Sequence, residues 1–252
     1  MQNWKGRLHA SGIHLGISLS IAALAAAVVF GLWYPYPYRE ISGGRSLFLL
    51  VVFVDVVMGP LITLVIFNRT KPRRELMTDF LVVGLLQLAA LSYGLWTVFV
   101  ARPVHLVFEY NRMAVVQAID VDPELLSKAP RELQTLPMTG PTAIALRPFK
   151  NAAEQMDATI AAMGGAPLPA RSDLWQPYRD SVADILKEAK PAAELQTRFP
   201  SQASLIHQAI ESTGKTVAQL RYLPLLSRND AWTVLLDATT AEPAGFIPLD
   251  SF

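Results

Sequence analysis

The stretch SLFLLVVFVDVVMGPLITLVIF, residues 46–67, decides the class of the fold. Its apolar length exceeds the roughly 20 residues that one helical crossing of a bilayer needs. Asp55 nevertheless lies near its middle, and Gly59 and Pro60 follow one turn later. An ionisable side chain at mid-bilayer costs roughly 2.5–3.5 kcal/mol on insertion scales, so it usually faces protein and has a partner. The stretch therefore predicts a membrane span whose Asp55 faces protein and not lipid.

Two further stretches pass the same length test, residues 12–33 before it and residues 79–100 after it. The first is too long for the apolar core of a typical signal peptide. It also runs into WYPYPY, whose aromatic side chains suit the headgroup zone of a bilayer. The apolar excess ends near residue 101. We therefore expect a three-helix transmembrane domain over residues 1–101 and a soluble domain over residues 102–252.

Basic residues in the short loops predict the direction of the spans, because cytoplasmic loops carry an excess of Lys and Arg. Lys5 and Arg7 precede the first span, whereas the loop between the first two spans has only Arg39 and Arg45. The next loop, residues 68–78, is rich in basic side chains: Arg69, Lys71, Arg73 and Arg74. The N-terminus is therefore expected in the cytoplasm. After three crossings the soluble domain lies on the far side, which in a bacterium is the periplasm.

The soluble half opens with an apparent exit from the membrane at Arg102-Pro103. The arginine is expected to anchor at the interface, and the proline to start an extended chain. Alternation of apolar residues then predicts a β-hairpin over residues 104–121, with its turn at Asn111-Arg112. Helical patterns follow, including one with Asp122 as N-cap and Pro123 at its first position, and one that starts at a cap at Ser172 or Asp173.

The last third of the chain returns to strand patterns over residues 220–228, 231–239 and 244–252, with a turn at Arg228-Asn229-Asp230. Strands at both ends of the soluble half and helices between them predict an α+β domain with a mainly antiparallel sheet. The expected fold class is thus three transmembrane α-helices followed by a periplasmic α+β domain.

Composition and motifs argue against several classes of function. The formal net charge is +1, which gives no global case for nucleic-acid binding, and cysteine is absent. The four histidines do not pair at metal-ligand spacing, and neither a nucleophile elbow nor a phosphate-binding glycine loop occurs. We therefore expect no enzyme, with no catalytic residue, no cofactor and no metal site.

Asp55 is the one residue that invites a functional interpretation. It could be structural, protonated by burial and hydrogen-bonded to Gln87 or Tyr93 of the third span. Alternatively, Asp55 and the break at Gly59 and Pro60 form a polar notch for another transmembrane helix, in which Gly59 allows close approach and Pro60 frees a backbone carbonyl. A proton or ion path is less favoured, since three spans make a poor channel. The candidate intramembrane site thus comprises these five residues.

At this point the chain resembles a known family. The three apolar spans together with the opening hairpin are similar to the type IV pilin accessory proteins of the TfpX/TfpZ type, and the likeness is strongest over about residues 10–120. Its most specific pieces are DVVMGPL at 55–61, QLAA at 87–90, Tyr93-Gly94, and Ala101-Arg102-Pro103. The family more often has leucine where Met58 stands here.

The resemblance implies an inner-membrane protein encoded near a major pilin gene, which acts on its cognate pilin and influences pilin stability or pilus assembly. It implies no catalysis, no cofactor and no established active site. The expected partners are the lipid bilayer and the pilin, through its transmembrane helix, its globular head or both, with strand edges in 104–121 and 221–249 available for β-augmentation. The alternatives are a membrane-anchored periplasmic scaffold or sensor without pilin specificity, and, less favoured, a periplasmic enzyme.

Overall fold

A computed structural model describes residues 2–66, 72–227 and 230–252. The chain forms two compact units: a helical unit of Met1–Arg39 and Gly43–Ala101, and a sheet unit of Glu40–Ser42 and Arg102–Phe252. Three expectations from the sequence lie outside the described residues. They are the end of the second span at Phe67, the basic residues Arg69 and Lys71, and the turn at Arg228-Asn229.

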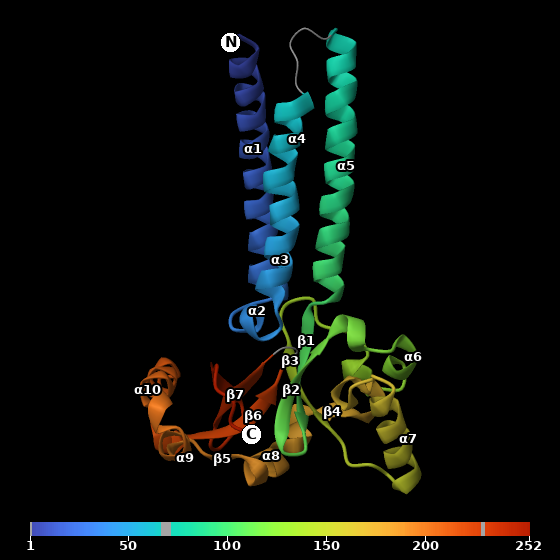
Figure 1. The fold of residues 1–252 in the computed structure, drawn as a ribbon. Coiled ribbons are helices and arrows are strands. Elements are labelled where there is room, and N and C mark those ends of the chain that lie inside the picture. The colour runs from blue at the N-terminus through green and yellow to red at the C-terminus, as the bar shows by residue number, and fades with distance from the viewer. Residues whose placement is uncertain (1, 67–71, 228–229) are drawn as a thin grey trace. The chain divides into compact units, whose positions relative to one another are not determined.

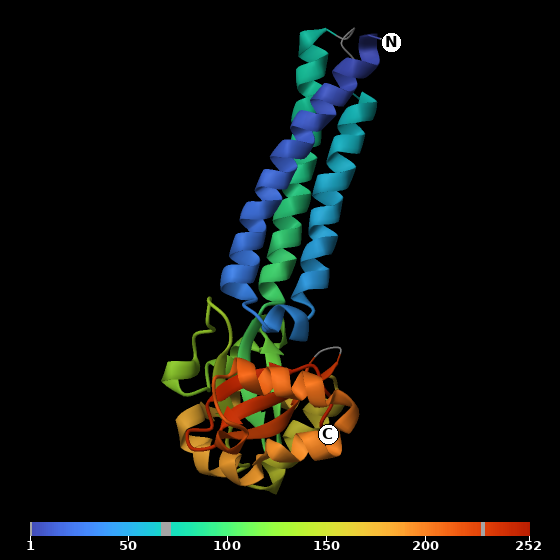
Figure 2. The same ribbon diagram turned by 90° about the vertical axis from the view of Figure 1, so that its left-hand side faces the viewer.

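The helical unit has three helices that are long and apolar enough to cross a membrane, Trp4–Trp33, Gly44–Ile66 and Arg73–Val100. Figures 1 and 2 show them running side by side. Their constituent elements are α1 (Gln2–Val28) with the π-helical turn η1 (Val29–Trp33), then α3 (Gly44–Phe53), the π-helical turn η2 (Val54–Met58), α4 (Gly59–Ile66) and α5 (Arg73–Val100), and the short α2 (Tyr38–Ile41) follows the first span. The three expected spans are confirmed. The first and third helices begin several residues before the apolar stretches do, because a helix continues through polar residues at its end.

One end of the helical unit is tightly packed around Tyr34. This side chain is fully buried, and its hydroxyl donates a hydrogen bond of 3.0 Å to the backbone oxygen of Val98 in α5. A Cβ on Gly44 would lie 2.2 Å from the Tyr34 ring, so only glycine fits there. Phe30 and Phe48 meet edge to face at 5.0 Å. Tyr34 therefore ties the first span to the third, and is not the headgroup anchor that its sequence position suggested.

The sheet unit is built on a sheet with strand order β4-β3-β1-β2-β6-β7-β8, and β5 pairs with β6 beside this path. Among the described strands, only the β1–β3 and β2–β6 pairs are parallel. The expected fold class, three apolar helices followed by a mainly antiparallel sheet domain, is confirmed. The strands are β1 (Pro103–Glu109), β2 (Arg112–Gln117), β3 (Thr142–Leu146), β4 (Trp175–Pro177), β5 (Lys190–Pro191), β6 (Leu220–Leu226), β7 (Ala231–Asp237) and β8 (Pro243–Ile247).

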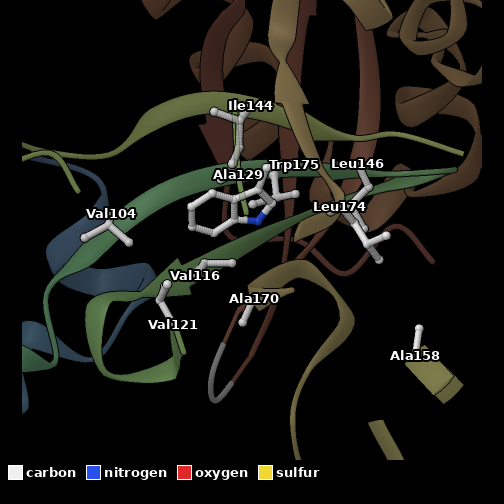
Figure 3. Close-up of a cluster of buried hydrophobic side chains, with 11 residues drawn as sticks. Val104, Val116, Val121, Ala129, Ile144, Leu146, Ala158, Ala170, Leu174 and Trp175 are labelled. Atoms are coloured by element: carbon white, nitrogen blue, oxygen red, sulfur yellow. The ribbon is translucent and has the colours of Figure 1, made fainter. Parts of the chain in front are cut away.

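Helices of the sheet unit cover the two halves of the sheet separately. Around the β1–β4 half, Trp175 lies in the middle of an apolar cluster that includes Val104, Val116 and Ile144 (Figure 3). A second cluster joins β6, β7 and β8 to the helices that Figure 2 shows in orange. The α-helices of this unit are α6 (Pro123–Leu126), α7 (Ala152–Met163), α8 (Val182–Glu188), α9 (Ala193–Arg198) and α10 (Ala203–Ser212).

In the sheet unit, the expected helix cap is confirmed and the expected hairpin turn is wrong. Asp122 does cap a helix with Pro123 at its first position, since its carboxylate accepts the backbone N–H of Glu124. The hairpin turn, however, is Tyr110-Asn111 and not Asn111-Arg112. Tyr110 adopts a positive φ of 57°, and Arg112 instead opens β2. The reason lies in the closing pair, because the Arg112 guanidinium holds both carboxylate oxygens of Glu109 at 2.8 and 2.9 Å.

The prediction that a helix starts at a cap at Ser172 or Asp173 is wrong. Residues Ser172–Leu174 form a single 3-10 turn and Trp175–Pro177 form β4, so that the helix α8 begins only at Val182. The physical reason is the burial of Trp175, whose indole N–H donates to the Pro169 oxygen at 2.8 Å. A large core side chain with that partner fixes the segment against β3.

The strands of 104–121 are not sheet edges. β1 lies between β3 and β2, and β2 is covered by β6 at Met113 and Ala114. Among the described strands, no partner pairs with the outer side of Val115–Gln117, so β2 is open over its second half. Of the strands in 221–249, β8 is an edge, whereas β6 and β7 are paired on both sides.

His105 on β1 makes the sheet unit sensitive to acid. Its ring is buried against Trp175, and burial lowers its pKa to about 4. Nδ1 lies 2.9 Å from the Thr142 hydroxyl oxygen, while Nε2 has no partner among the described residues. An unfolded histidine titrates near pH 6.5, so the neutral ring stabilises the fold fully above that pH, and this stability is lost as the pH falls towards 4.

We predict that His105→Phe, which removes the titration and keeps a ring against Trp175, flattens the pH dependence of stability between pH 6.5 and 4. The acid-induced loss in the native protein should exceed that of the variant by about 2–3 kcal/mol. Thermal melts of the detergent-solubilised chain, followed by circular dichroism, measure this. His207 is exposed beside Glu211 and serves as the control, since His207→Gln should keep the native slope. An unchanged slope in His105→Phe would contradict the assignment.

Candidate functional site

The second span is interrupted at its middle by the missing N–H of Pro60. In the π-helical turn η2 each carbonyl pairs five residues ahead, so the donor for the Asp55 carbonyl would be residue 60. Proline has no N–H to give. The Asp55 carbonyl instead accepts a long hydrogen bond of 3.5 Å from the Gln87 side chain of α5. The break in the helix is thus compensated from the third span.

Polar side chains of α1 bind the same region from the other side. The Ser11 hydroxyl donates to the Pro60 carbonyl oxygen at 2.8 Å, and His14 Nδ1 shares a hydrogen bond of 2.6 Å with the Thr63 hydroxyl. Thr63 is 2% exposed, so this contact lies inside the helical unit. All three spans therefore meet through polar contacts at the depth of Pro60.

The Asp55 carboxyl differs from these neighbours in its hydrogen bonding. Its residue is only 9% exposed, yet no hydrogen bond to its carboxylate oxygens occurs within the described part of the chain. His14 is the ionisable side chain close enough to interact with it electrostatically. Asp55 lines a cavity of about 520 Å³. The carboxyl is thus buried from the surroundings of the protein but available to whatever fills that cavity.

The cavity is a groove between α1 and α5, which we call the Asp55 groove. Each wall is one face of a helix, as the spacing of three and four residues shows. The outer parts of the walls, such as Ile17 and Leu88, are more than half exposed, so the groove opens to one side. The α1 wall comprises Ala10, Ile13, His14, Ile17, Ser18 and Ile21, and the α5 wall comprises Phe80, Val83, Gly84, Gln87, Leu88 and Leu91.

The structure brings four of the five predicted intramembrane residues together. Asp55 lies in the groove, Gln87 bonds to its carbonyl, and Pro60 causes the break. Gly59 is the close-approach point, since a Cβ there would lie 1.8 Å from Gln87 Nε2 and 3.1 Å from His14 Nε2.

Tyr93 lies elsewhere. It is 70% exposed and contacts Trp96 at 6.1 Å between ring centroids. Six residues separate it from Gln87, which turns it by about 120° around the helix. Tyr93 is therefore on another face of α5 and does not bond to Asp55.

Arg102 and Pro103 occupy the start of the sheet unit. Arg102 is 5% exposed, and its guanidinium donates to the Pro137 carbonyl oxygen at 3.4 Å and contacts the Met138 sulfur at 3.8 Å. It is therefore a buried structural residue and not an exposed interface anchor. Pro103 is also buried and begins β1, as expected from the fixed φ of proline.

Sequence reasoning missed Ser11, His14, Thr63 and Gly84. The signal was present in the first span, where His14 is an ionisable residue inside an apolar stretch just as Asp55 is. Gly84 has no atom within 4 Å of a built Cβ, which leaves room for another backbone in the groove. The pattern of residues 80, 83, 84, 87, 88 and 91 also lies on one helical face.

A second cleft, of about 630 Å³, lies in the sheet unit beside the open half of β2. It is bounded by Val115, by the Ala158 face of α7, by Leu168 and by Leu226 at the end of β6. Glu109 and Arg112 close the hairpin and form an ion pair at one end. Backbone groups of a strand with an open side can pair with an extended segment. This cleft is mainly apolar.

Within the described residues, no group of three or more His, Cys, Asp or Glu side chains is placed to hold a metal ion. The groove and the cleft are surfaces suited to binding a protein segment.

Comparison with known proteins gives one consistent result. The family model described as fimbrial assembly protein FimB matches residues 2–43. A fimbrial assembly protein of serogroup I from Dichelobacter nodosus is 35% identical over 229 residues, which are 90% of this chain and 89% of that protein. The serogroup E1 protein of the same bacterium is 33% identical over 229 residues with the same coverage. No solved structure matches the chain.

We predict that Gly59→Leu loosens the helical unit, because its side chain would displace both Gln87 and His14. Overpacking of this kind costs about 1–3 kcal/mol. The apparent melting temperature of the detergent-solubilised protein should fall, whereas Gly12→Leu should leave it unchanged, since no atom lies within 4 Å of a Cβ at Gly12. Gly59→Ala is the milder variant, which the flexible end of Gln87 can accommodate by moving. Equal melting temperatures for Gly59→Leu and Gly12→Leu would refute the packing role.

Proposed function

The chain belongs to the family of fimbrial assembly proteins, and we propose that it is an inner-membrane accessory protein that binds its cognate type IV pilin and modulates pilin stability and pilus assembly. The family membership confirms the resemblance found in the sequence. The relatives named for fimbrial assembly align over 90% of the chain, so the likeness includes the helical and the sheet unit. The observation that carries the proposal is the groove with an unpaired Asp55 inside a unit of membrane-length helices.

The proposed action begins in the membrane. A type IV pilin waiting for assembly keeps one N-terminal helix in lipid, and the Asp55 groove is a place for such a helix to lie. The groove walls offer apolar side chains over about three helical turns, and Gly84 leaves room for close backbone approach. A pilin held there is kept from aggregation and degradation until the assembly machinery takes it, which is a chaperone-like role.

The sheet unit supplies a second place of contact, for the globular head of the pilin. The open half of β2 and the cleft beside it are suited to pairing with an extended segment. Contact through both units would make the helix and the head of one pilin bind together, which raises the overall affinity without a new contact at either place.

The proposed orientation puts the N-terminus in the cytoplasm and the sheet unit in the periplasm. Lys5 and Arg7 lie in the first turns of the first membrane helix, and Arg73 and Arg74 begin the third. These ends share the cytoplasmic side if basic residues are retained there. A periplasmic sheet unit is on the side where the head of a pilin lies.

We predict that a photo-crosslinking residue at Leu88 or Ile17, on the two groove walls, captures pilin in cells that make it. Leu86 and Leu19 are matched controls on the same two helices. They are similarly exposed, lie within two residues of the probe sites and point away from the groove. Adducts should form at the groove positions and be several-fold weaker at the controls.

The same strains give the functional readout. Deletion of the gene should lower the pilin level, the number of surface pili or both, and the full chain should restore them. If neither probe position recovers pilin and deletion changes neither pilin level nor piliation, the proposed function fails. A scaffold or sensor without pilin specificity would then be the better description.

We predict the orientation from single cysteine variants, which are clean because the chain has no cysteine of its own. Met156→Cys in the exposed part of α7 should react with a membrane-impermeant maleimide added to cells with a permeable outer membrane. Glu75→Cys at the start of α5 should react only after the inner membrane is also broken. The reversed labelling pattern would rule out the proposed orientation.

A further inference from the structure

The unpaired carboxyl of Asp55 defines what the groove should bind. We infer that the Asp55 groove takes a transmembrane helix that carries a hydrogen-bond-donating side chain at the depth of Asp55. The inference rests on the proposed function, since the occupant is taken to be the membrane helix of the cognate pilin. It adds the recognition chemistry, which neither the family nor the groove's shape supplies.

The neighbouring polar groups are already engaged inside the chain. Gln87 donates to the Asp55 backbone oxygen, the His14 ring is bonded to Thr63, and the Ser11 hydroxyl donates to the Pro60 oxygen. Each of these three side chains thus already has one hydrogen-bond partner inside the helical unit. By contrast, the Asp55 carboxyl has no hydrogen bond among the described residues, and Asp55, which is 9% exposed as a residue, lines the groove.

The complement of a carboxyl is a hydrogen-bond donor. In lipid no water competes for the carboxyl, so a donor that enters the groove gains an interaction that it lacks elsewhere in the bilayer. An acyl chain of a lipid can fill the apolar walls but has no donor for Asp55. The pairing therefore favours a protein helix over lipid.

The dimensions of the groove also fit a helix. Its α1 wall extends from Ala10 to Ile21, about 16 Å along the axis or three turns. Small residues lie along it, with Ser18 on one wall and Gly84 on the other, and nothing lies within 4 Å of a Cβ at Gly84. Small residues allow two helix backbones to approach closely, which a bound helix needs to bring its side chain to the floor.

A second copy of this chain is a less complementary occupant. Its Ser11, His14 and Gln87 are engaged internally, as above. Its exposed Tyr93 lies six residues beyond Gln87, or about 9 Å along the axis from the depth of the groove floor. A parallel pair of copies would therefore not place that hydroxyl at Asp55.

The test measures pilin capture from the Leu88 probe in the full chain with native Asp55, with Asp55→Asn and with Asp55→Leu. Capture is normalised to the amount of each protein in the membrane. Asp55→Leu should lower the adduct roughly 3- to 20-fold, the range expected for losing one intramembrane hydrogen bond. Asp55→Asn keeps the shape and one acceptor oxygen, so it should retain more adduct than Asp55→Leu.

A second measurement addresses the partner. Each donor side chain of the pilin membrane helix is replaced in turn by leucine. One replacement should reproduce the loss, and combining it with Asp55→Leu should cause little additional loss, because the two residues act as a pair. This coupling is measured on folded, membrane-inserted proteins and does not depend on one variant alone.

The outcomes separate the two ideas. Absence of any pilin adduct with native Asp55 would overturn the inference, and the proposed function would fail with it if deletion also left pilin level and piliation unchanged. Normal pilin capture by Asp55→Leu, or an equal loss in Asp55→Asn and Asp55→Leu, would leave that function standing and overturn the hydrogen-bond inference. An adduct between two copies of this chain in place of pilin would overturn the choice of occupant.

Discussion

The missing N–H of Pro60 is the constraint on which the arrangement of the helical unit depends. It leaves the Asp55 carbonyl without a donor in its own helix, and the π-helical turn brings that carbonyl within reach of Gln87 in α5. Ser11 and His14 of α1 bind just beyond the break, at Pro60 and Thr63. One absent hydrogen bond thus gathers side chains from all three spans. Lipid has no group that could satisfy the broken backbone, so the neighbouring helices must.

The unit is held differently at its two levels. Around Tyr34 the spans are joined by close packing, with the Tyr34 hydroxyl on the Val98 carbonyl and its ring against Gly44. At the depth of Pro60, α4 packs on α1 while a groove separates α1 from α5. Because the contacts around Tyr34 hold the three helices together, the Asp55 groove can stay open while the bundle remains assembled. A groove that is already formed costs a bound helix less than one that must first be assembled.

The architecture of the membrane part could be predicted from the sequence because the patterns that indicate it are local. Apolar length and loop charge depend on neighbouring residues alone, and the three spans and the special position of Asp55 followed from them. The proposed hydrogen bond between Tyr93 and Asp55 is absent from the described part of the chain, because the position of a residue along a helix does not say which face of the helix it occupies. Tyr93 lies about 9 Å along the axis from Gln87 and about 120° from it around α5.

In the sheet unit the expectations failed where a contact of the folded domain overrides local preference. No strand was expected over residues 142–146, where β3 forms by pairing in parallel with β1. The Ser172–Leu174 cap signal yields to the burial of Trp175, whose indole is held by Pro169. Tyr110 takes a positive φ because the Glu109–Arg112 pair fixes the register of the hairpin. Of these contacts, only the pairing of β1 with β3 joins residues that are far apart in the chain.

Stability alone does not account for the carboxyl at position 55. The break at Pro60 uses the Asp55 backbone oxygen, which any residue would provide, and leaves the side chain with no bond among the described residues. A leucine there would serve the backbone equally and would avoid the cost of a polar group in lipid, roughly 2.5–3.5 kcal/mol for a charged one. The free chain therefore bears a cost that it does not recover within its own helices. A donor brought by another helix recovers it, so the energy of the unpaired carboxyl becomes part of the affinity for that helix and of its selection over helices without a donor.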